Sequence, residues 1–178
     1  MFSTQYFSKP LAFIVLMITL TFLMLIASCT DTTVVPEQVA TKAATPIMLN
    51  VYKSPTCGCC KKWIDHIDDN GFQSKAHNQT DISIIKHQHG IAPRYRSCHT
   101  AISSQGYVFE GHVPAKFIHQ FLQEQHADNV IGLSVPAMPL GSPGMEVGDK
   151  FHPYKVLLLK SDGSYDVYAS IQSAQEQF

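Results

Sequence analysis

The feature that most restricts the fold of this chain is a cluster of three cysteines between an expected strand and an expected helix. Residues 47–53 (IMLNVYK) alternate in hydropathy and are rich in β-forming side chains, which predicts a strand. From Cys60 to Ile67, apolar residues recur at every third or fourth position, as on one face of an amphipathic helix. Cys57, Cys59 and Cys60 (the C-x-C-C motif) therefore lie where a strand gives way to the first turn of a helix.

Strands and helices are expected to alternate through the rest of the chain. The predicted elements are a strand over 72–77, a helix over 81–89, strands over 97–103 and 107–112, a helix from Pro114, a loop over 126–153, and a hairpin of strands 154–160 and 165–169. The order β-α-β-α-β-β-α, with cysteines after the first strand, favours the α/β class. We predict a thioredoxin-like fold with an added C-terminal loop and β-hairpin.

The start of a helix favours the reactive form of cysteine. Free backbone N–H groups and the helix dipole stabilise thiolate over thiol, and Lys61 and Lys62 add positive charge nearby. Thiolates are both nucleophiles and soft-metal ligands, so Cys57 and Cys60 fit a redox pair as well as a metal site. Core packing alone accounts for Cys60, which lies on the apolar stripe, but explains the other two cysteines poorly.

A fourth cysteine, Cys98, lies on the predicted strand after Pro93. In thioredoxin-like folds the segment that follows the second helix faces the active-site cysteines, often through a cis-proline. If Pro93 is that proline, Cys98 approaches the cluster. This expectation depends on analogy with the fold.

The N-terminus has the pattern of a secretory leader. Lys9 is the only charged residue before an uncharged stretch over 11–27, and Ile-Ala-Ser precedes Cys29 as in a bacterial lipobox. We predict a signal peptide over 1–28, lipidation of Cys29, a flexible tether over 29–46 and a metal-binding domain over 47–178. An uncleaved signal anchor is the alternative. Thr30 after the cysteine favours the outer membrane, on the periplasmic side of the envelope. The formal net charge of −1 offers no basic field for nucleic acid.

Four thiolates in an oxidising compartment suit a soft metal, either copper(I) or zinc. Three ligands within four residues crowd a single tetrahedral zinc, whereas bridging thiolates tolerate such crowding. We therefore favour copper(I), including a multinuclear thiolate cluster. Met138 and Met145, in an irregular loop, are candidate thioether ligands, although they serve equally well as apolar cover.

Two histidines, His99 and His112, bracket the predicted central hairpin. Either one can ligate a metal or orient a ligand through a hydrogen bond.

Four ordered motifs resemble those of the CopG-type copper-resistance family, long described only as a domain of unknown function. They are YKSPTCGCCKKW from Tyr52, SCHTA from Ser97, EGHVPA from Glu110 and VPAMPLGSPGME from Val135. The resemblance covers residues from about 47 to 170. It implies a thioredoxin-like fold, an envelope location, a role in copper tolerance, and metal ligation by the four cysteines of residues 57, 59, 60 and 98. The family's loop usually has Pro-Gly-Met-Pro, where this chain has Ala137 in place of the glycine.

The predicted function is therefore envelope copper binding for tolerance, through sequestration, redox conversion or hand-over to export. Copper ions, periplasmic export or chaperone proteins and a lipid anchor in the membrane are the expected partners. The first rival is a thiol–disulfide oxidoreductase that uses Cys57 and Cys60. The second is a structural zinc or disulfide module. Whether the protein is an enzyme, acting on copper or on disulfides, stays open at this point.

Overall fold

The computed structural model describes residues 46–178. The expected signal peptide, the lipidation at Cys29 and the tether up to residue 45 lie outside the described residues, so these stay predictions. Within 46–178, no helix is both long and apolar enough to cross a membrane.

Seven strands and three α-helices make up this part of the chain. In chain order they are β1 (Ile47–Lys53), α2 (Gly58–Asp69), β2 (Phe72–Asn78), α3 (Ser83–Gln88), β3 (His99–Ser103), β4 (Val108–Gly111), α4 (Ala115–Gln123), β5 (Val130–Val135), β6 (Tyr154–Lys160) and β7 (Tyr165–Ile171). Two short 3-10 helices, η1 (Pro93–Tyr95) and η2 (Ala174–Gln177), complete the set.

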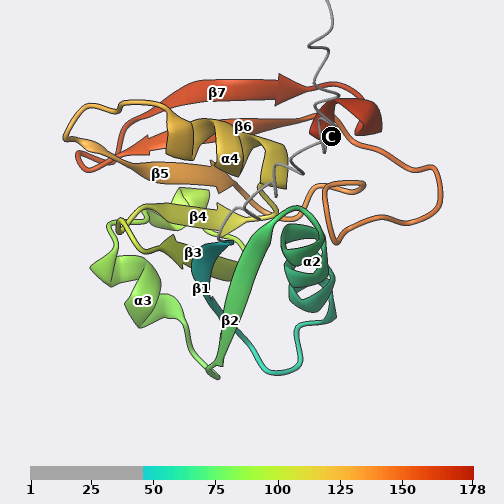
Figure 1. The fold of residues 1–178 in the computed structure, drawn as a ribbon, viewed down its shortest axis with the longest axis horizontal. Coiled ribbons are helices and arrows are strands. Elements are labelled where there is room, and N and C mark those ends of the chain that lie inside the picture. Colours follow the sequence, from blue (N-terminus) through green and yellow to red (C-terminus); the bar gives the residue numbers. More distant parts are fainter. Residues whose placement is uncertain (1–45) are drawn as a thin grey trace, which may run out of the picture. The chain divides into compact units, whose positions relative to one another are not determined.

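All seven strands belong to one mixed sheet in the order β2-β1-β3-β4-β5-β6-β7 (Figure 1). β1 and β2 run parallel, while β3 is antiparallel to both of its neighbours, β1 and β4. This four-strand arrangement, with α2 linking the parallel pair, agrees with the predicted thioredoxin-like α/β fold.

The strand β5 corrects the prediction of a continuous loop over 126–153. It pairs in parallel with β4 and antiparallel with β6, so the C-terminal hairpin extends the central sheet. Its sequence, VIGLSV, becomes fully buried along its second half and shows no alternation of polar and apolar residues. Gly132 also weakens the sequence signal for a strand, because glycine is uncommon within strands. The position requires glycine, since an added Cβ would lie 1.9 Å from the Val108 carbonyl oxygen.

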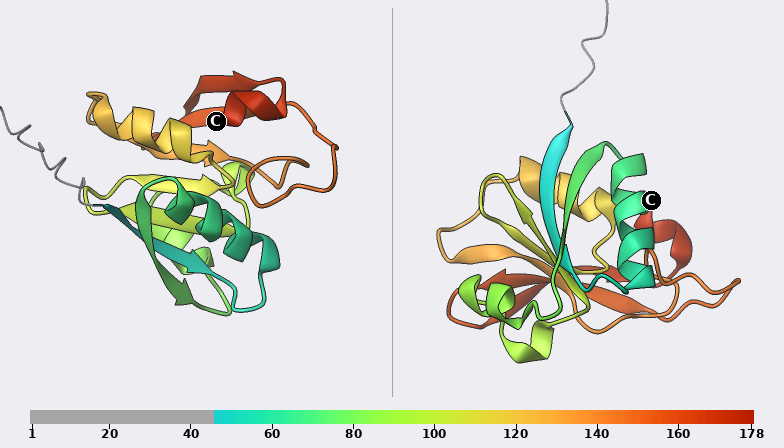
Figure 2. Two further views of the ribbon diagram at one scale, coloured as in Figure 1. Left: turned by 45° about the vertical axis from the view of Figure 1, so that its right-hand side comes forward. Right: turned by 90° about the horizontal axis from the view of Figure 1, so that it is seen from below.

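Helices cover both faces of the sheet, and each face has its own core. On one face α2 and α4 pack together, and Trp63, Phe109 and Phe121 are fully buried in the larger core cluster. The Trp63 Nε1–H donates to the Val113 carbonyl at 2.9 Å, which links α2 to the segment before α4. The helix α3 lies on the opposite side of the sheet (Figure 2), where Ile91 and residues of β4 and β6 form a smaller cluster.

Candidate metal site

The C-x-C-C motif lies at the first turn of α2, as predicted. Cys57 is the N-cap residue, and its Sγ accepts a hydrogen bond from the Cys60 N–H at 3.3 Å. Cys60 faces the core and is fully buried, whereas Cys57 and Cys59 are half-buried. This gives two accessible sulfur atoms and one inner sulfur atom at the same helix end.

The four cysteines grouped in the sequence analysis meet in space. Cys57 and Cys60 are joined by a disulfide, while Cys59 and Cys98 are free thiols. The Cys59 Sγ lies 3.5 Å from the Cys57 Sγ and 3.9 Å from the Cys98 Sγ. All four sulfur atoms lie within 4.8 Å of one another.

These separations fit a shared soft metal. A metal–sulfur bond of about 2.3 Å places neighbouring sulfur ligands of one metal roughly 3.8–4.0 Å apart. The Cys59–Cys98 separation of 3.9 Å already meets this value. Ligation by all four sulfur atoms also requires two electrons and two protons to reduce the Cys57–Cys60 disulfide to thiols.

Cys98 reaches the cluster by a different route from the one expected. Among the described residues no peptide bond is cis, and Pro93 begins the 3-10 helix η1. Cys98 lies immediately before β3, not within a strand that begins at residue 97. Its carbonyl oxygen lies 3.7 Å from the Cys60 Sγ, so the segment still faces the start of α2.

The free thiol of Cys98 is held in its neutral form. Burial, followed by the neighbouring Cys59, raises the pKa of Cys98 to about 12. Lys61 offers little compensation, because its side chain is 74% exposed and pairs with Asp65 at 3.1 Å. Metal binding at Cys98 therefore has to displace a proton.

His112 is fully buried and aims one ring nitrogen at the cluster. Its Nδ1–H donates to the Pro143 carbonyl at 2.8 Å, and its Nε2 lies 3.1 Å from the Cys98 Sγ. Burial lowers the pKa of His112, so the ring is neutral and the Nε2 lone pair faces the sulfur.

His99 lies against the same sulfur atom. Its Nδ1 is 3.3 Å from the Cys98 Sγ, and its ring stacks at a tilt on Trp63. Burial lowers its pKa well below the ordinary value, and its Nε2 has no hydrogen-bond partner among the described residues. Cys98, His99 and His112 thus form a second group of possible ligands that shares Cys98 with the first.

The loop after β5 covers the site with its backbone. Gly144, with a φ of +86°, approaches α2 so closely that an added Cβ would lie 2.7 Å from the Cys59 carbonyl oxygen. Met145 is half-buried beside it, whereas Met138 is 49% exposed. Pro143 and Gly144 are therefore the loop residues that cover the site. Ligation by either methionine stays a prediction.

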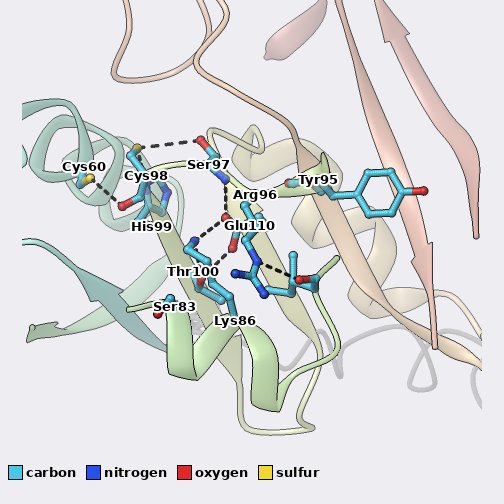
Figure 3. Close-up of polar contacts among 12 residues, drawn as sticks. Cys60, Ser83, Lys86, Tyr95, Arg96, Ser97, Cys98, His99, Thr100 and Glu110 are labelled. Carbon is cyan, nitrogen blue, oxygen red and sulfur yellow. Dashed lines mark hydrogen bonds and ion pairs between the residues drawn. The ribbon is translucent and has the colours of Figure 1, made fainter. Parts of the chain in front are cut away.

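A buried polar network that was not predicted from the sequence lies behind Cys98. Lys86 of α3 and Glu110 of β4 form an ion pair at 2.5 Å, with side chains 6% and 0% exposed. Thr100 and the Ser97 N–H also bond the same carboxylate (Figure 3). One sequence signal was available, since Glu110 is the only charge within the apolar run 107–113.

Comparison with known proteins gives two similarities. Residues 95–145 match the family described as "Protein of unknown function, DUF411". Two solved structures, forms 1 and 2 of the copper resistance protein CopG, are 38% identical to this chain with TM-scores of 0.66. The alignments cover 72% and 71% of this chain respectively and 99% of each CopG chain. No curated protein sequence matches this chain.

Proposed function

The chain belongs to the family of the CopG copper resistance proteins, and from this premise we propose that it binds copper(I) through four thiolates. The observation that carries the proposal is the convergence of Cys57, Cys59, Cys60 and Cys98 within 4.8 Å. Thiolate sulfur is a soft donor, and copper(I) is the soft ion that best matches it.

One feature favours copper(I) over zinc at this site, and a second adds a donor that suits either metal. The chain places three cysteines within one turn, which suits thiolates that bridge several copper ions better than one closed tetrahedral zinc. His112 supplies a neutral nitrogen 3.1 Å from the Cys98 sulfur, and its orientation is fixed by the Pro143 carbonyl. We propose that His112 either completes the coordination of copper beside Cys98 or orients that sulfur.

The oxidation state of Cys57 and Cys60 would control copper binding, because a disulfide must be reduced before its two sulfur atoms can act as thiolate ligands. A thiol reductant gives two electrons and two protons to the disulfide, and the two thiols then lose their protons as copper(I) binds. Cys57, Cys59 and Cys98 are half-buried whereas Cys60 is fully buried, so copper would leave through the three outer sulfur atoms by exchange onto a partner's thiolates. In this proposal the protein serves copper tolerance in the cell envelope, anchored through a lipid on Cys29.

A second candidate function is thiol–disulfide exchange. The Cys57–Cys60 disulfide at the N-terminus of α2 favours it, since this is the placement of a C-x-x-C redox pair. The two functions make different demands on the other cysteines. Disulfide exchange requires only Cys57 and Cys60, whereas the copper site requires all four.

Single Cys→Ser variants at the four positions separate these functions. Each reduced variant is offered copper(I) in competition with a chromophoric chelator, and each is assayed for reduction of a disulfide substrate. The copper site predicts a comparable loss of copper in all four variants, Cys98→Ser included. Wild-type copper retention in Cys98→Ser, together with disulfide reduction that is lost in Cys57→Ser and Cys60→Ser but kept in Cys98→Ser, would establish the oxidoreductase instead. Urea unfolding of each variant verifies that it is folded.

A further inference from the structure

We propose that Glu110 is a positioning residue of the copper site: its carboxylate, paired with Lys86, fixes the backbone segment that carries Cys98. This inference rests on the proposed copper function and assigns a role to a buried network that reaches the cysteine cluster only at Ser97, whose hydroxyl lies 3.9 Å from the Cys98 Sγ. Cys98 is the one thiolate ligand from outside the C-x-C-C motif, so its placement decides whether the fourth sulfur meets the other three.

The sheet holds the chain on one side of Cys98 only, since β3 begins at His99, which pairs with Lys53 of β1. The pairing of β3 with β4 ends at Thr100 opposite Glu110, and residues 96–98 form an irregular connection between η1 and β3. The Ser97 N–H has no strand partner and donates instead to the Glu110 Oε1 at 2.6 Å. A side chain, and not the backbone ladder, thus anchors the residue before Cys98.

The carboxylate is itself fixed by two other donors. The Lys86 Nζ donates to Oε1 at 2.5 Å, and the Thr100 hydroxyl donates to Oε2 at 2.6 Å. Lys86 also donates to the Thr100 hydroxyl oxygen at 3.0 Å, which closes the network (Figure 3). A buried ion pair is weak as a source of stability, because its desolvation offsets its attraction. What an apolar pair of similar volume lacks is the set of directional hydrogen bonds that fix the carboxylate in one orientation.

Contacts with neighbouring segments restrict Ser97 on two further sides. An added Cβ at Gly111 would lie 2.6 Å from the Ser97 Cβ, so β4 approaches the segment closely just after Glu110. On its other side, the Ser97 hydroxyl donates to the Ala137 carbonyl. The hydrogen bond to Glu110 fixes the Ser97 backbone on the third side. The Cys98 Sγ then lies 3.9 Å from the Cys59 Sγ and 3.1 Å from the His112 Nε2.

Two double variants isolate the hydrogen bond to Ser97 from the charge pair. Lys86→Met with Glu110→Gln removes both charges but keeps an acceptor oxygen for the Ser97 N–H. Lys86→Met with Glu110→Leu removes the acceptor as well. The matched control is Lys160→Met with Asp166→Asn, which removes a pair at 2.7 Å on the β6–β7 hairpin, where neither residue belongs to the cysteine cluster.

Two readouts are made on each full-length protein. The first is copper(I) retention against a chelator. The second is the alkylation rate of Cys98 in copper-free protein, measured by mass spectrometry. Loss of an outer-shell partner typically weakens metal binding by about 10- to 100-fold, so we expect at least tenfold weaker retention and faster Cys98 alkylation in the leucine variant. The glutamine variant and the control should stay within about threefold of wild type, well short of that outer-shell effect.

Equal behaviour of the leucine and glutamine variants, with both folded by urea unfolding, would overturn the positioning role. If the leucine variant does not fold, Glu110→Ala and Glu110→Gln in the presence of Lys86 make the same comparison. The alkylation rate in copper-free protein tests Glu110 even if wild type retains no copper, so failure of the copper function and failure of this inference give different results.

Discussion

Replacement of Gly144 by alanine should open the loop that covers the cysteines. The glycine has a φ of +86°, which costs an L-residue roughly 1–2 kcal/mol. Its new Cβ would also lie 2.7 Å from the Cys59 carbonyl oxygen and 2.8 Å from the Trp63 nitrogen, both backbone atoms of α2. Forced overpacking of this kind costs typically about 1–3 kcal/mol. We therefore expect a total loss of about 2–5 kcal/mol, or a loop displaced from α2.

Gly106→Ala provides the matched control. Gly106 has nearly the same φ, +88°, but an added Cβ there meets nothing within 4 Å. Urea unfolding of both variants should show the smaller loss in Gly106→Ala, and thiol labelling of Cys59 should be faster only in Gly144→Ala. Equal losses of stability together with unchanged labelling would refute the idea that the loop presses on the cysteine site.

Three other variants or conditions test separate parts of the account. His112→Ala should weaken copper(I) retention about tenfold in chelator competition, because Pro143 fixes its ring with Nε2 toward Cys98; unchanged retention would remove His112 from the site. For copper-free protein, burial lowers the pKa of His99 and His112, so the unfolded chain binds more protons below pH 6.5 and stability falls as the pH falls. In urea unfolding between pH 7 and 5, the free energy of unfolding should fall by up to about 1.4 kcal/mol per pH unit for each histidine. A free energy of unfolding that does not change with pH would contradict this prediction. Ala137→Gly should raise stability by up to about 1 kcal/mol, since the alanine has a φ of +58°; a lower urea midpoint would argue against strain there.

The local elements and the cysteine grouping were predictable from the sequence because each has a short-range cause. The alternation in 47–53 and the apolar stripe up to Ile67 predicted β1 and the extent of α2 well. The C-x-C-C motif then fell at the helix start, where its cysteines have little packing role. Such patterns depend on neighbours within one turn or one strand, so no tertiary knowledge is needed.

Features set by distant contacts were not predictable. The strand β5 is buried by β4 and β6 and therefore lacks the alternation that reveals a half-exposed strand. The pairing of Lys86 with Glu110 joins residues 24 positions apart, and only the fold shows that both are buried. The spacing of Cys57 and Cys60 did indicate a redox pair, but whether such a pair is oxidised depends on the redox potential around it and not on the spacing.

One paired measurement tests whether the four cysteines bind copper(I). The reduced protein is loaded anaerobically with copper(I) and desalted, and its copper content and its reactive thiols are then counted. We predict retained copper, more than one ion per chain if the thiolates bridge, and protection of Cys57, Cys59, Cys60 and Cys98 from labelling. A protein that retains no copper, with all four thiols reactive and a Cys57–Cys60 disulfide that re-forms on oxidation, would contradict it.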